Sequence, residues 1–259
     1  MNKEYVKMVV TDLDGTLLKD DKTISDYSLN IIDEFRKKGN LFVIATARPI
    51  RTAKKFMSRG GFDAGIYHNG ALIYDKNIRL GGNGIENPYI ISRNILDKFP
   101  NTCIAIEAED VLYANFDSER LWTGNGYVYS DNFKELAEKI ADKIIVEVSS
   151  IADMERYKKL LPDELYIQLS ENKIGMIMNK KATKINGIKL LSKIYQVDMD
   201  NIISFGDDYN DIDMIQGCGK GIVVENALKP VKEIATEICK SNEDDGVANW
   251  IKDNLLIEN

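Results

Sequence analysis

Short apolar runs recur in the first and last thirds of the chain and predict buried strands. A run from Val6 to Val10 opens the series and ends in "MVVT" at 8–11. Runs of four or five apolar residues bounded by polar ones are typical of strands buried on both faces. The later runs read "LFVIA" at 41–45, "NIISF" at 201–205 and "GIVV" at 221–224.

Amphipathic helices are predicted between these strands. Ser25 is a candidate N-cap and Gly39 follows the expected end of the first helix, while a second starts at Pro49 and stops near Gly60 and Gly61. Strands that alternate with helices indicate a parallel sheet covered on both faces, with right-handed crossovers. The C-terminal third repeats the pattern, with helices expected over about 183–195, through "NDIDMI" at 210–215, and around Pro230 and Val247.

The middle of the chain has a different rhythm. A turn-rich cluster, "GGNGIENP" at 81–88, precedes strand-like runs separated by about two helical stretches. The pattern predicts an α/β protein whose core, residues 1–80 and 183–259, is interrupted by an inserted α+β unit over 81–182. The runs of that unit are "CIAIEAEDVLYANF", "KIIVEVSS", "ELYIQLS" and "KIGMIM".

Composition narrows the functional classes. The 259 residues include 34 basic and 41 acidic side chains, a net charge of −7, with no basic stripe, so we expect neither nucleic acid nor a membrane as partner. Cys103, Cys218 and Cys239 form no CxxC pair, which favours reduced thiols. The chain shows no signal peptide and no apolar run long enough to span a bilayer. We therefore expect a cytoplasmic protein.

Polar side chains follow three of the predicted strands. Asp12 follows "MVVT", Thr46 follows "LFVIA" and Asp207 follows "NIISFG". An acidic residue after a single strand most often only caps a turn or helix. Because ligands of open α/β sheets bind at the carboxyl ends of the strands, three such exits together favour a binding site.

A second acidic cluster, "GDDYNDIDM", begins at Gly206. If a helix starts near its second aspartate, Asp207, Asn210 and Asp211 can converge with Asp12 on one point. Such oxygen ligands suit Mg²⁺, which is usually held by one or two carboxylates together with a phosphate. The alternative is that acids in the first turn only complement the helix dipole, and we interpret the remaining two aspartates in that way.

Lys184 contradicts the usual electrostatics of a helix start. It lies in "NKKATKINGI", where a predicted helix begins and the helix dipole disfavours cations. We expect an anion beside it, either a phosphate or the acidic cluster. Lys180 and Lys181 are as well explained by solvated side chains on a surface turn.

Several motifs in order resemble one known family. The set is similar to that of the haloacid dehalogenase (HAD) superfamily, specifically the Cof-type phosphatases with a type IIB cap, and covers both core segments almost completely. The motifs are "DLDGT" at 12–16, Thr46 in "IATAR", "HNGALIY" at 68–74, Lys184 before "NGI", "GDDYND" at 206–211, "VENA" at 224–227 and "EDDGVANWI" at 243–251.

The resemblance implies a fold and a set of roles. The fold is a Rossmannoid three-layer core with a parallel sheet, in which a cap inserted after the third strand supplies substrate specificity. Asp12 would be the nucleophile, Asp14 the general acid and base, and Thr46 and Lys184 would orient the phosphate. The implied cofactor is Mg²⁺, and the candidate metal ligands are Asp12, Asp14, Asp207 and Asp211.

Further phosphate or substrate contacts are expected on the loops that follow the strands. Arg48 could touch phosphate or be a solvated side chain at a helix start, and Ala47 stands where many family members have glycine. Asn69-Gly70 is also a type I′ hairpin signal, although the resemblance suggests that its loop lies near the substrate. The expected set is Thr46, Ala47, Arg48, Asn69, Gly70, Lys184 and Asn210.

Three functions remain open at this stage. A Mg²⁺-dependent phosphatase of small phosphorylated metabolites, foremost sugar phosphates, acting through an aspartyl-phosphate, is favoured. The alternatives are a phosphosugar mutase or phosphotransferase and, less favoured, a catalytically silent phosphate-binding module, for which the acid and base Asp14 would have no use. The expected partner is a small phosphate ester, bound by a monomer or weak homodimer.

Overall fold

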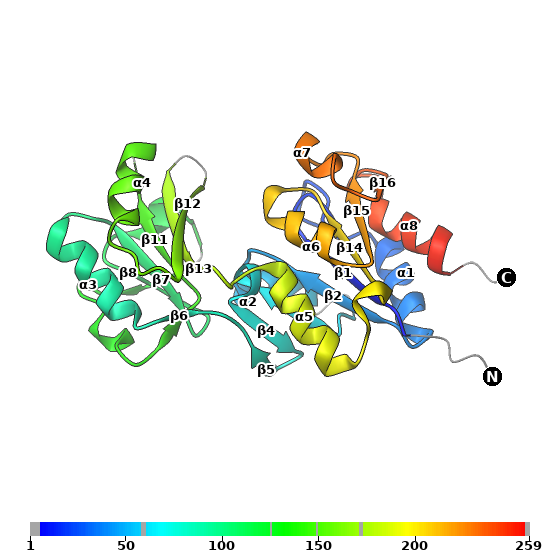
Figure 1. Cartoon of the computed structure of the whole chain (residues 1–259), viewed down its shortest axis with the longest axis horizontal. Coiled ribbons are helices and arrows are strands. Elements are labelled where there is room, and N and C mark those ends of the chain that lie inside the picture. The colour runs from blue at the N-terminus through cyan, green and yellow to red at the C-terminus, as the bar shows by residue number, and fades with distance from the viewer. Residues whose placement is uncertain (1–5, 58–60, 125, 149, 171–172, 257–259) are drawn as a thin grey trace. The chain divides into compact units, whose positions relative to one another are not determined.

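The computed structural model in Figure 1 describes the chain except for residues 1–5, 58–60, 125, 149, 171–172 and 257–259. It divides into two compact units. The first consists of Met1–Gly81 together with Thr183–Asn259, and the second is Gly82–Ala182. The chain therefore leaves the first unit once and returns to it.

A parallel sheet forms the centre of the first unit. Its order is β16-β15-β14-β1-β2-β3-β4-β5, and the neighbours from β16 to β3 are all parallel, whereas β4 and β5 are antiparallel. The α/β class is thereby confirmed. The strands are β1 Met8–Thr11, β2 Leu41–Ala45, β3 Ala64–Tyr67, β4 Leu72–Asp75, β5 Ile78–Gly81, β14 Ile202–Gly206, β15 Lys220–Val224 and β16 Glu237–Cys239.

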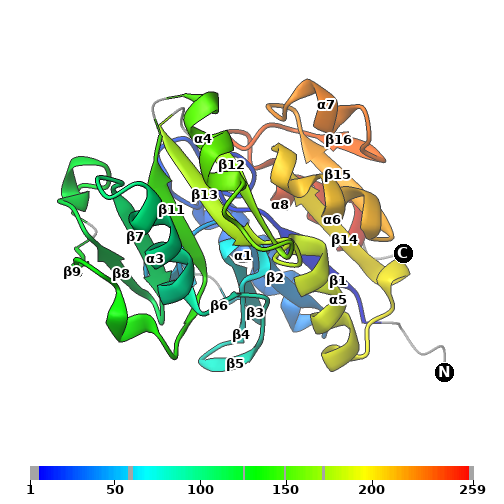
Figure 2. The same cartoon turned by 60° about the vertical axis from the view of Figure 1, so that its left-hand side comes forward.

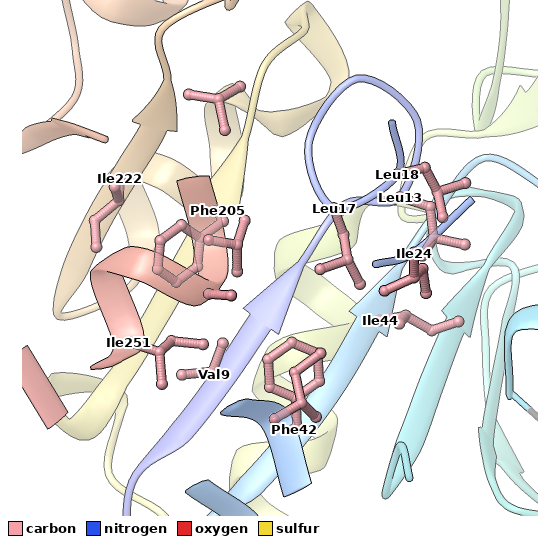
Figure 3. Packing of buried hydrophobic residues seen from close by; sticks show 14 of the residues in the cluster. Val9, Leu13, Leu17, Leu18, Ile24, Phe42, Ile44, Phe205, Ile222 and Ile251 are labelled. Atoms are coloured by element: carbon pink, nitrogen blue, oxygen red, sulfur yellow. The ribbon is translucent and has the colours of Figure 1, made fainter. Parts of the chain in front are cut away.

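Helices cover both faces of this sheet because its strands are apolar on both. Val9 of β1 packs in the cluster of Phe42, Phe205 and Ile251, which Figure 3 shows, while Met8 of the same strand packs in the cluster on the other face. α1 and α8 belong to the first cluster and α5 to the second. The helices are α1 Asp26–Lys37, α2 Ile50–Met57, α5 Lys184–Tyr195, α6 Ile212–Gly217, α7 Lys229–Lys232 and α8 Gly246–Leu255.

The ends of the predicted elements need some corrections. The first strand starts at Met8 and not at Val6, which is 45% exposed, because both neighbouring strands pair with β1 only from Met8 onward. The strand β16 escaped prediction, since an edge strand of three half-exposed residues carries little hydrophobic signal. Ser25 does cap α1, by accepting a hydrogen bond from the amide of Ser28. Gly60, where the second helix was expected to stop, lies outside the described residues.

The hairpin between β3 and β4 exists, but its turn differs from the predicted two-residue type I′ turn. Tyr67 pairs with Leu72, so the loop comprises residues 68–71 and contains a 3-10 turn. Asn69 (φ 56°) and Gly70 (φ 114°) both have positive φ, which is the feature that the Asn-Gly pair correctly signalled. The longer loop places its backbone beside the start of α5, as described below.

The second unit is an α+β structure with a six-stranded sheet of order β12-β13-β11-β7-β8-β9 and a separate pair, β6 and β10 (Figure 2). The helices α3 and α4 pack on one face of the six-stranded sheet, and a cluster that includes Trp122 and Tyr127 packs on the other. Its elements are β6 Ile85–Glu86, α3 Pro88–Lys98, β7 Ile104–Ala108, β8 Val111–Ala114, β9 Val128–Tyr129, β10 Ile140–Ala141, β11 Lys143–Glu147, α4 Ile151–Lys158, β12 Leu165–Ser170 and β13 Ile174–Asn179.

Two features bear on the expected surroundings of the protein. Within the described part of the chain, no helix has the length and hydrophobicity needed to cross a bilayer. Cys103, Cys218 and Cys239 are all free thiols.

Helix α5 approaches the sheet closely at Gly187. A Cβ atom built on this residue would lie 2.8 Å from Cγ2 of Ile66 on β3. Real Cβ contacts are longer than this, so a larger residue there would force the Ile66 side chain or α5 itself to shift. This packing also fixes the distance from the sheet at which Lys184 lies, since Lys184 is in the same helix about one turn earlier.

We predict that Gly187→Ala lowers the free energy of unfolding by about 1–3 kcal/mol, although alanine favours helix by about 1 kcal/mol, because the added methyl group overpacks the contact with Ile66. Thermal denaturation measures the change. Lys189→Ala, at an exposed position of α5, is the matched control and should leave the midpoint nearly unchanged. A stabilised Gly187→Ala variant would show that α5 does not pack at this depth.

Candidate active site

Asp12 lies where β1 ends, and the sheet fixes its backbone. Its amide donates to the carbonyl of Phe205 on β14 (3.0 Å), and its side chain is buried. The buried side chain of Leu13 then anchors the following loop, and the amide of Leu17 donates back to the Leu13 carbonyl. The first strand therefore ends in a charge because its carboxyl end forms the floor of a polar site.

Lys184 has the anion partners that its position at a helix start required. Its Nζ donates to Oδ1 of Asp12 (2.7 Å) and to Oδ1 of Asp211 (2.6 Å), and the side chain is fully buried. Burial by itself would lower the pKa of Lys184, but the two carboxylates outweigh it and hold the pKa above the usual range. By contrast, Lys180 and Lys181 are exposed.

Asp211 acts as a buried connector. It ends the 3-10 turn Tyr209–Asp211, and its Oδ2 accepts hydrogen bonds from the amides of Asp207 (2.9 Å) and Asp208 (3.1 Å). Asp208 completes a capping box with it. A Cβ atom on Gly206 would come within 2.5–2.7 Å of the Asp211 side chain, so the strand end must be glycine. Both carboxylate oxygens of Asp211 are thus already engaged.

Asp207 faces the loop after β1. Its Oδ1 accepts a hydrogen bond from the Thr16 hydroxyl (2.5 Å), and a Cβ on Gly15 would lie 2.5 Å from its Oδ2. Gly15 also has φ +76°, a conformation that favours glycine. Thr16 was not among the predicted site residues, although it is the last residue of the motif "DLDGT".

Three carboxylates come together at this end of the sheet. One oxygen from each of Asp12, Asp207 and Asp211 lies within 4.8 Å of the others. Burial raises the pKa of Asp12 well above its usual range, against the lowering effect of the Lys184 ammonium, and the charge of Asp211 raises it further. Burial likewise raises the pKa of Asp207 to about 6, although the Thr16 hydroxyl opposes the shift. The group carries more negative charge than its single ammonium balances.

The side chain of Asp14, which is also among the expected metal ligands, is not part of that group of carboxylates. Its Oδ2 and Oδ1 accept hydrogen bonds from Nε (2.5 Å) and Nη2 (2.7 Å) of Arg48, and Lys22 Nζ lies 3.0 Å from Oδ1. Burial would raise the pKa of Asp14, but the hydrogen bonds and charges of Arg48 and Lys22 hold it below the usual range. Arg48 is therefore not a solvated side chain, and Lys22 was missed because nothing in its local pattern distinguishes it.

Thr46 is buried at the end of β2 and joined to the β3–β4 loop. Its amide donates to the carbonyl of Ile66 (2.8 Å), its carbonyl accepts from the amide of Asn69 (3.0 Å), and its hydroxyl accepts from the amide of Arg48 (3.2 Å). Ala47, between Thr46 and Arg48 in the sequence, is half-buried, and only its backbone groups could bind a phosphate. Hydrogen bonds thus join the loop after β2 to the loop after β3.

Asn69, Gly70 and Asn210 extend this arrangement toward α5 and the acidic turn. Nδ2 of Asn210 donates to Oδ1 of Asn69 (3.1 Å), while the buried Oδ1 of Asn210 has no hydrogen-bond partner. A Cβ on Gly70 would lie 2.4 Å from the carbonyl of Thr183, the N-cap of α5. The structure therefore brings all the expected phosphate-contact positions into the first unit, around one end of its sheet.

Two asparagines that were not among the predicted site residues support the loop after β1. Asn226 donates through Nδ2 to the carbonyl of Gly15 (2.7 Å) and accepts from the amide of Asn242 (3.0 Å). Nδ2 of Asn242 donates to the carbonyl of Leu18 (3.0 Å). In the sequence, Asn226 lies within the motif "VENA" and Asn242 directly precedes "EDDGVANWI", and nothing else pointed to either residue.

Comparison with known proteins agrees with this geometry. A family model described as haloacid dehalogenase-like hydrolase matches residues 9–251. The chain is 26% identical over 263 residues to the 5-amino-6-(5-phospho-D-ribitylamino)uracil phosphatase YitU of Bacillus subtilis, covering 95% of this chain and 96% of the relative.

Solved structures share the fold over nearly the whole length. TM0651 from Thermotoga maritima superposes with a TM-score of 0.83 at 25% identity, covering 98% of each chain. The HAD subclass IIB sugar phosphatase BT4131 superposes with a TM-score of 0.81 at 19% identity, covering 97% of this chain and 100% of its own. The chain belongs to the haloacid dehalogenase-like hydrolases, of the Cof type that its motifs predicted, and is a phosphoric monoester hydrolase.

Proposed function

We propose that this chain is a Mg²⁺-dependent phosphatase of small phosphorylated metabolites that acts through an aspartyl-phosphate on Asp12. The observation that carries the proposal is the charge of this largely buried group, in which three carboxylates lie close together and the ammonium of Lys184 contacts two of them. When all three are ionised, two negative charges remain uncompensated in a largely buried place, which is unfavourable without a cation. A divalent cation balances them.

The donors available in this group fit Mg²⁺. Asp12 and Asp207 each keep Oδ2 outside the hydrogen bonds to Lys184 and Thr16, whereas Asp211 uses both oxygens within the protein. Two hard oxygen donors, with the rest of the shell completed by water and phosphate, match the preference of Mg²⁺. We therefore propose Asp12 and Asp207 as direct ligands, Asp211 as their support, and no metal contact for the Asp14 carboxylate. When bound, Mg²⁺ would offset the charge of the phosphate facing the nucleophile.

The remaining groups fit the two halves of the reaction. A carboxylate oxygen of Asp12 attacks phosphorus, the bond to the ester oxygen breaks, and Asp14, which must be protonated at this step, gives that oxygen its proton. Arg48 and Lys22 favour the ionised form of Asp14, so we propose that the negative charge of the bound phosphate offsets their effect on its pKa. Asp14 then takes a proton from the water that hydrolyses the aspartyl-phosphate, which releases inorganic phosphate and restores both carboxyl groups. Lys184, held between two site carboxylates, and the Thr46 hydroxyl orient the phosphate and offset its charge. Arg48, Asn69 and Asn210 are proposed as further substrate contacts.

Two relatives of similar length support a proposal for the substrate class. Two Bacillus subtilis relatives, YitU and YcsE, are phosphatases of 5-amino-6-(5-phospho-D-ribitylamino)uracil, a phosphate ester of a sugar alcohol. We propose sugar and sugar-alcohol phosphates as substrates, with the inserted segment over 81–182 selecting the leaving group. The three free thiols support the expectation of a cytoplasmic protein, and we propose that it works as a monomer or weak homodimer.

Asp12→Asn should lower phosphate release by roughly a thousandfold or more, because an amide cannot serve as the nucleophile. The assay follows inorganic phosphate from sugar phosphates, nucleotides and the ribityl phosphate above, with Mg²⁺ or EDTA. Asp33→Asn, on the exposed surface of α1, removes one carboxylate and should keep full activity. Phosphate that moves to another hydroxyl instead of accumulating would favour a phosphotransferase, and Mg²⁺-independent release would contradict the metal role.

Mg²⁺ affinity should fall by about fourfold or more between pH 7.5 and pH 5.5, because protons compete for Asp207, whose pKa is raised to about 6, and for Asp12. Calorimetric titration of the metal-free protein with Mg²⁺ measures this. The Asp33→Asn protein should show the same pH dependence, and Asp207→Asn should bind Mg²⁺ far more weakly at both pH values. An affinity independent of pH would place the metal elsewhere.

Asp207→Asn should stabilise the metal-free protein at pH 8 by on the order of 1–2 kcal/mol and much less at pH 4.5. The folded-state pKa of Asp207 lies above the unfolded value, so its ionisation above about pH 6 opposes folding, and the asparagine removes this penalty. Urea denaturation at the two pH values gives both numbers. Equal effects at both, or destabilisation at pH 8, would show that the carboxylate is not strained by burial.

A further inference from the structure

The loop that follows the first strand contacts both oxygens of the Asp207 carboxylate. The Thr16 hydroxyl donates to Oδ1 of Asp207 (2.5 Å). On the other side, a Cβ on Gly15 would lie only 2.5 Å from Oδ2, so the backbone of Gly15 packs directly against that oxygen. Oδ2 is the atom of Asp207 that is left for Mg²⁺. Its direction therefore depends on where Gly15 and Thr16 lie.

Asn226 holds the peptide group that joins these two residues. Its Nδ2 donates to the carbonyl of Gly15 (2.7 Å). This carbonyl lies in one plane with the amide nitrogen and the Cα of Thr16, because the peptide bond is planar. The hydrogen bond from Asn226 consequently fixes the plane from which the Thr16 side chain projects toward Asp207.

The side chain of Asn226 is itself oriented by a second asparagine. Its Oδ1 accepts from the backbone amide of Asn242 (3.0 Å), so each polar atom of the Asn226 side chain faces a partner that only this atom can satisfy. Asn242 is buried, and its own Nδ2 donates to the carbonyl of Leu18 in the same loop (3.0 Å). Asn242 therefore holds both Asn226 and the far side of the loop that Asn226 contacts.

The segment that carries Asn226 also holds the backbone of Asp207. The two residues follow neighbouring parallel strands, Asn226 after β15 and Asp207 after β14. In the segment after β15, the amide of Leu228 donates to the carbonyl of Asp207 (2.9 Å). One short segment therefore contacts both sides of the hydrogen bond between Thr16 and Asp207, and it sets the distance between them.

A purely local role does not explain Asn226. Asparagine in a loop usually binds backbone groups close to it in the sequence, as in an Asx turn. Asn226 and Gly15 are instead 211 residues apart. Their hydrogen bond is also exposed, and the net contribution of a single hydrogen bond to stability is modest. Its loss should therefore change the geometry at Asp207 more than the stability of the fold.

We propose that Asn226 is a positioning residue that, oriented by Asn242, places the Thr16 hydroxyl and thereby the Asp207 carboxylate for binding of the metal ion. This inference rests on the proposed function, because it takes Asp207 as a ligand of Mg²⁺. Groups that orient a metal ligand directly change the metal affinity by about 10–100-fold when they are removed. Asn226 acts one contact further out, through Thr16, so its effect should be smaller.

Asn226→Ala should weaken the binding of Mg²⁺ to the metal-free protein by about three- to tenfold, measured by calorimetric titration at pH 7.5. The melting temperature should fall by less than about 4 °C, because only hydrogen bonds at an exposed position are lost. Asn254→Ala is the matched control. It removes an exposed asparagine whose Nδ2 likewise donates to a backbone carbonyl, that of Trp250 in α8 (2.9 Å), and it should leave the Mg²⁺ affinity unchanged.

Variants of Thr16 test whether Asn226 acts through the hydroxyl of this residue. Thr16→Val replaces the hydroxyl by a methyl group and should weaken Mg²⁺ binding by about tenfold. In the Thr16→Val background, Asn226→Ala should cause less than about twofold further loss, because the contact that it orients is already absent. Thr16→Ser keeps the hydroxyl, so in that background Asn226→Ala should again cause its full loss.

Two results would overturn the inference. The first is an Asn226→Ala protein with the Mg²⁺ affinity of the wild type, whether or not its melting temperature falls, since this would leave Asn226 a structural role alone. The second is an equal loss of affinity in the Thr16→Val and Thr16→Ser backgrounds, which would show that Asn226 does not act through the hydroxyl. Failure of the proposed function would look different, because Asp207→Asn would then bind Mg²⁺ as tightly as the wild type.

Discussion

The buried ion pair network of Lys184 is the interaction on which the site depends. Its ammonium joins Asp12 at the end of β1 to Asp211 behind the end of β14, so it connects two neighbouring strands and the helix α5 at one point. Buried charges are costly to bring out of water, and removing one member of such a network usually costs about 3–5 kcal/mol. The rest of the site is arranged around this fixed centre.

The three carboxylates of the network have two different roles. Asp211 satisfies Lys184 with one oxygen and the amides of Asp207 and Asp208 with the other, so it fixes the strand end without facing the reaction itself. Asp12 and Asp207, by contrast, each retain an oxygen outside these hydrogen bonds. The metal-free protein thus holds an excess of negative charge that a cation relieves, which is a common cost of prearranged sites.

Much of the fold was predictable because its signals are local. Apolar runs on both faces of β1, β2 and β14 require helices on both sides of a parallel sheet, and that class, like the family, is confirmed. The strand β16 and the four-residue loop around Asn69 could not be predicted in this way, because both depend on pairing with other strands. In the site, the anion beside Lys184 could be predicted from the helix dipole, but its identity could not. The salt bridge from Lys22 to Asp14 and the support from Asn226 and Asn242 arise only from contacts between distant segments.

The glycines at the site extend its demands to residues without any functional group. Gly15, Gly70 and Gly206 each lie where a Cβ atom would come within 2.4–2.5 Å of a site carboxylate or of the backbone that begins α5. A missense change at any of these codons adds at least one carbon atom and must displace part of the reactive group. We therefore expect substitutions at these three glycines to be tolerated as poorly as substitutions of the aspartates. A list of reactive side chains alone would underestimate the number of positions at which a mutation can inactivate the enzyme.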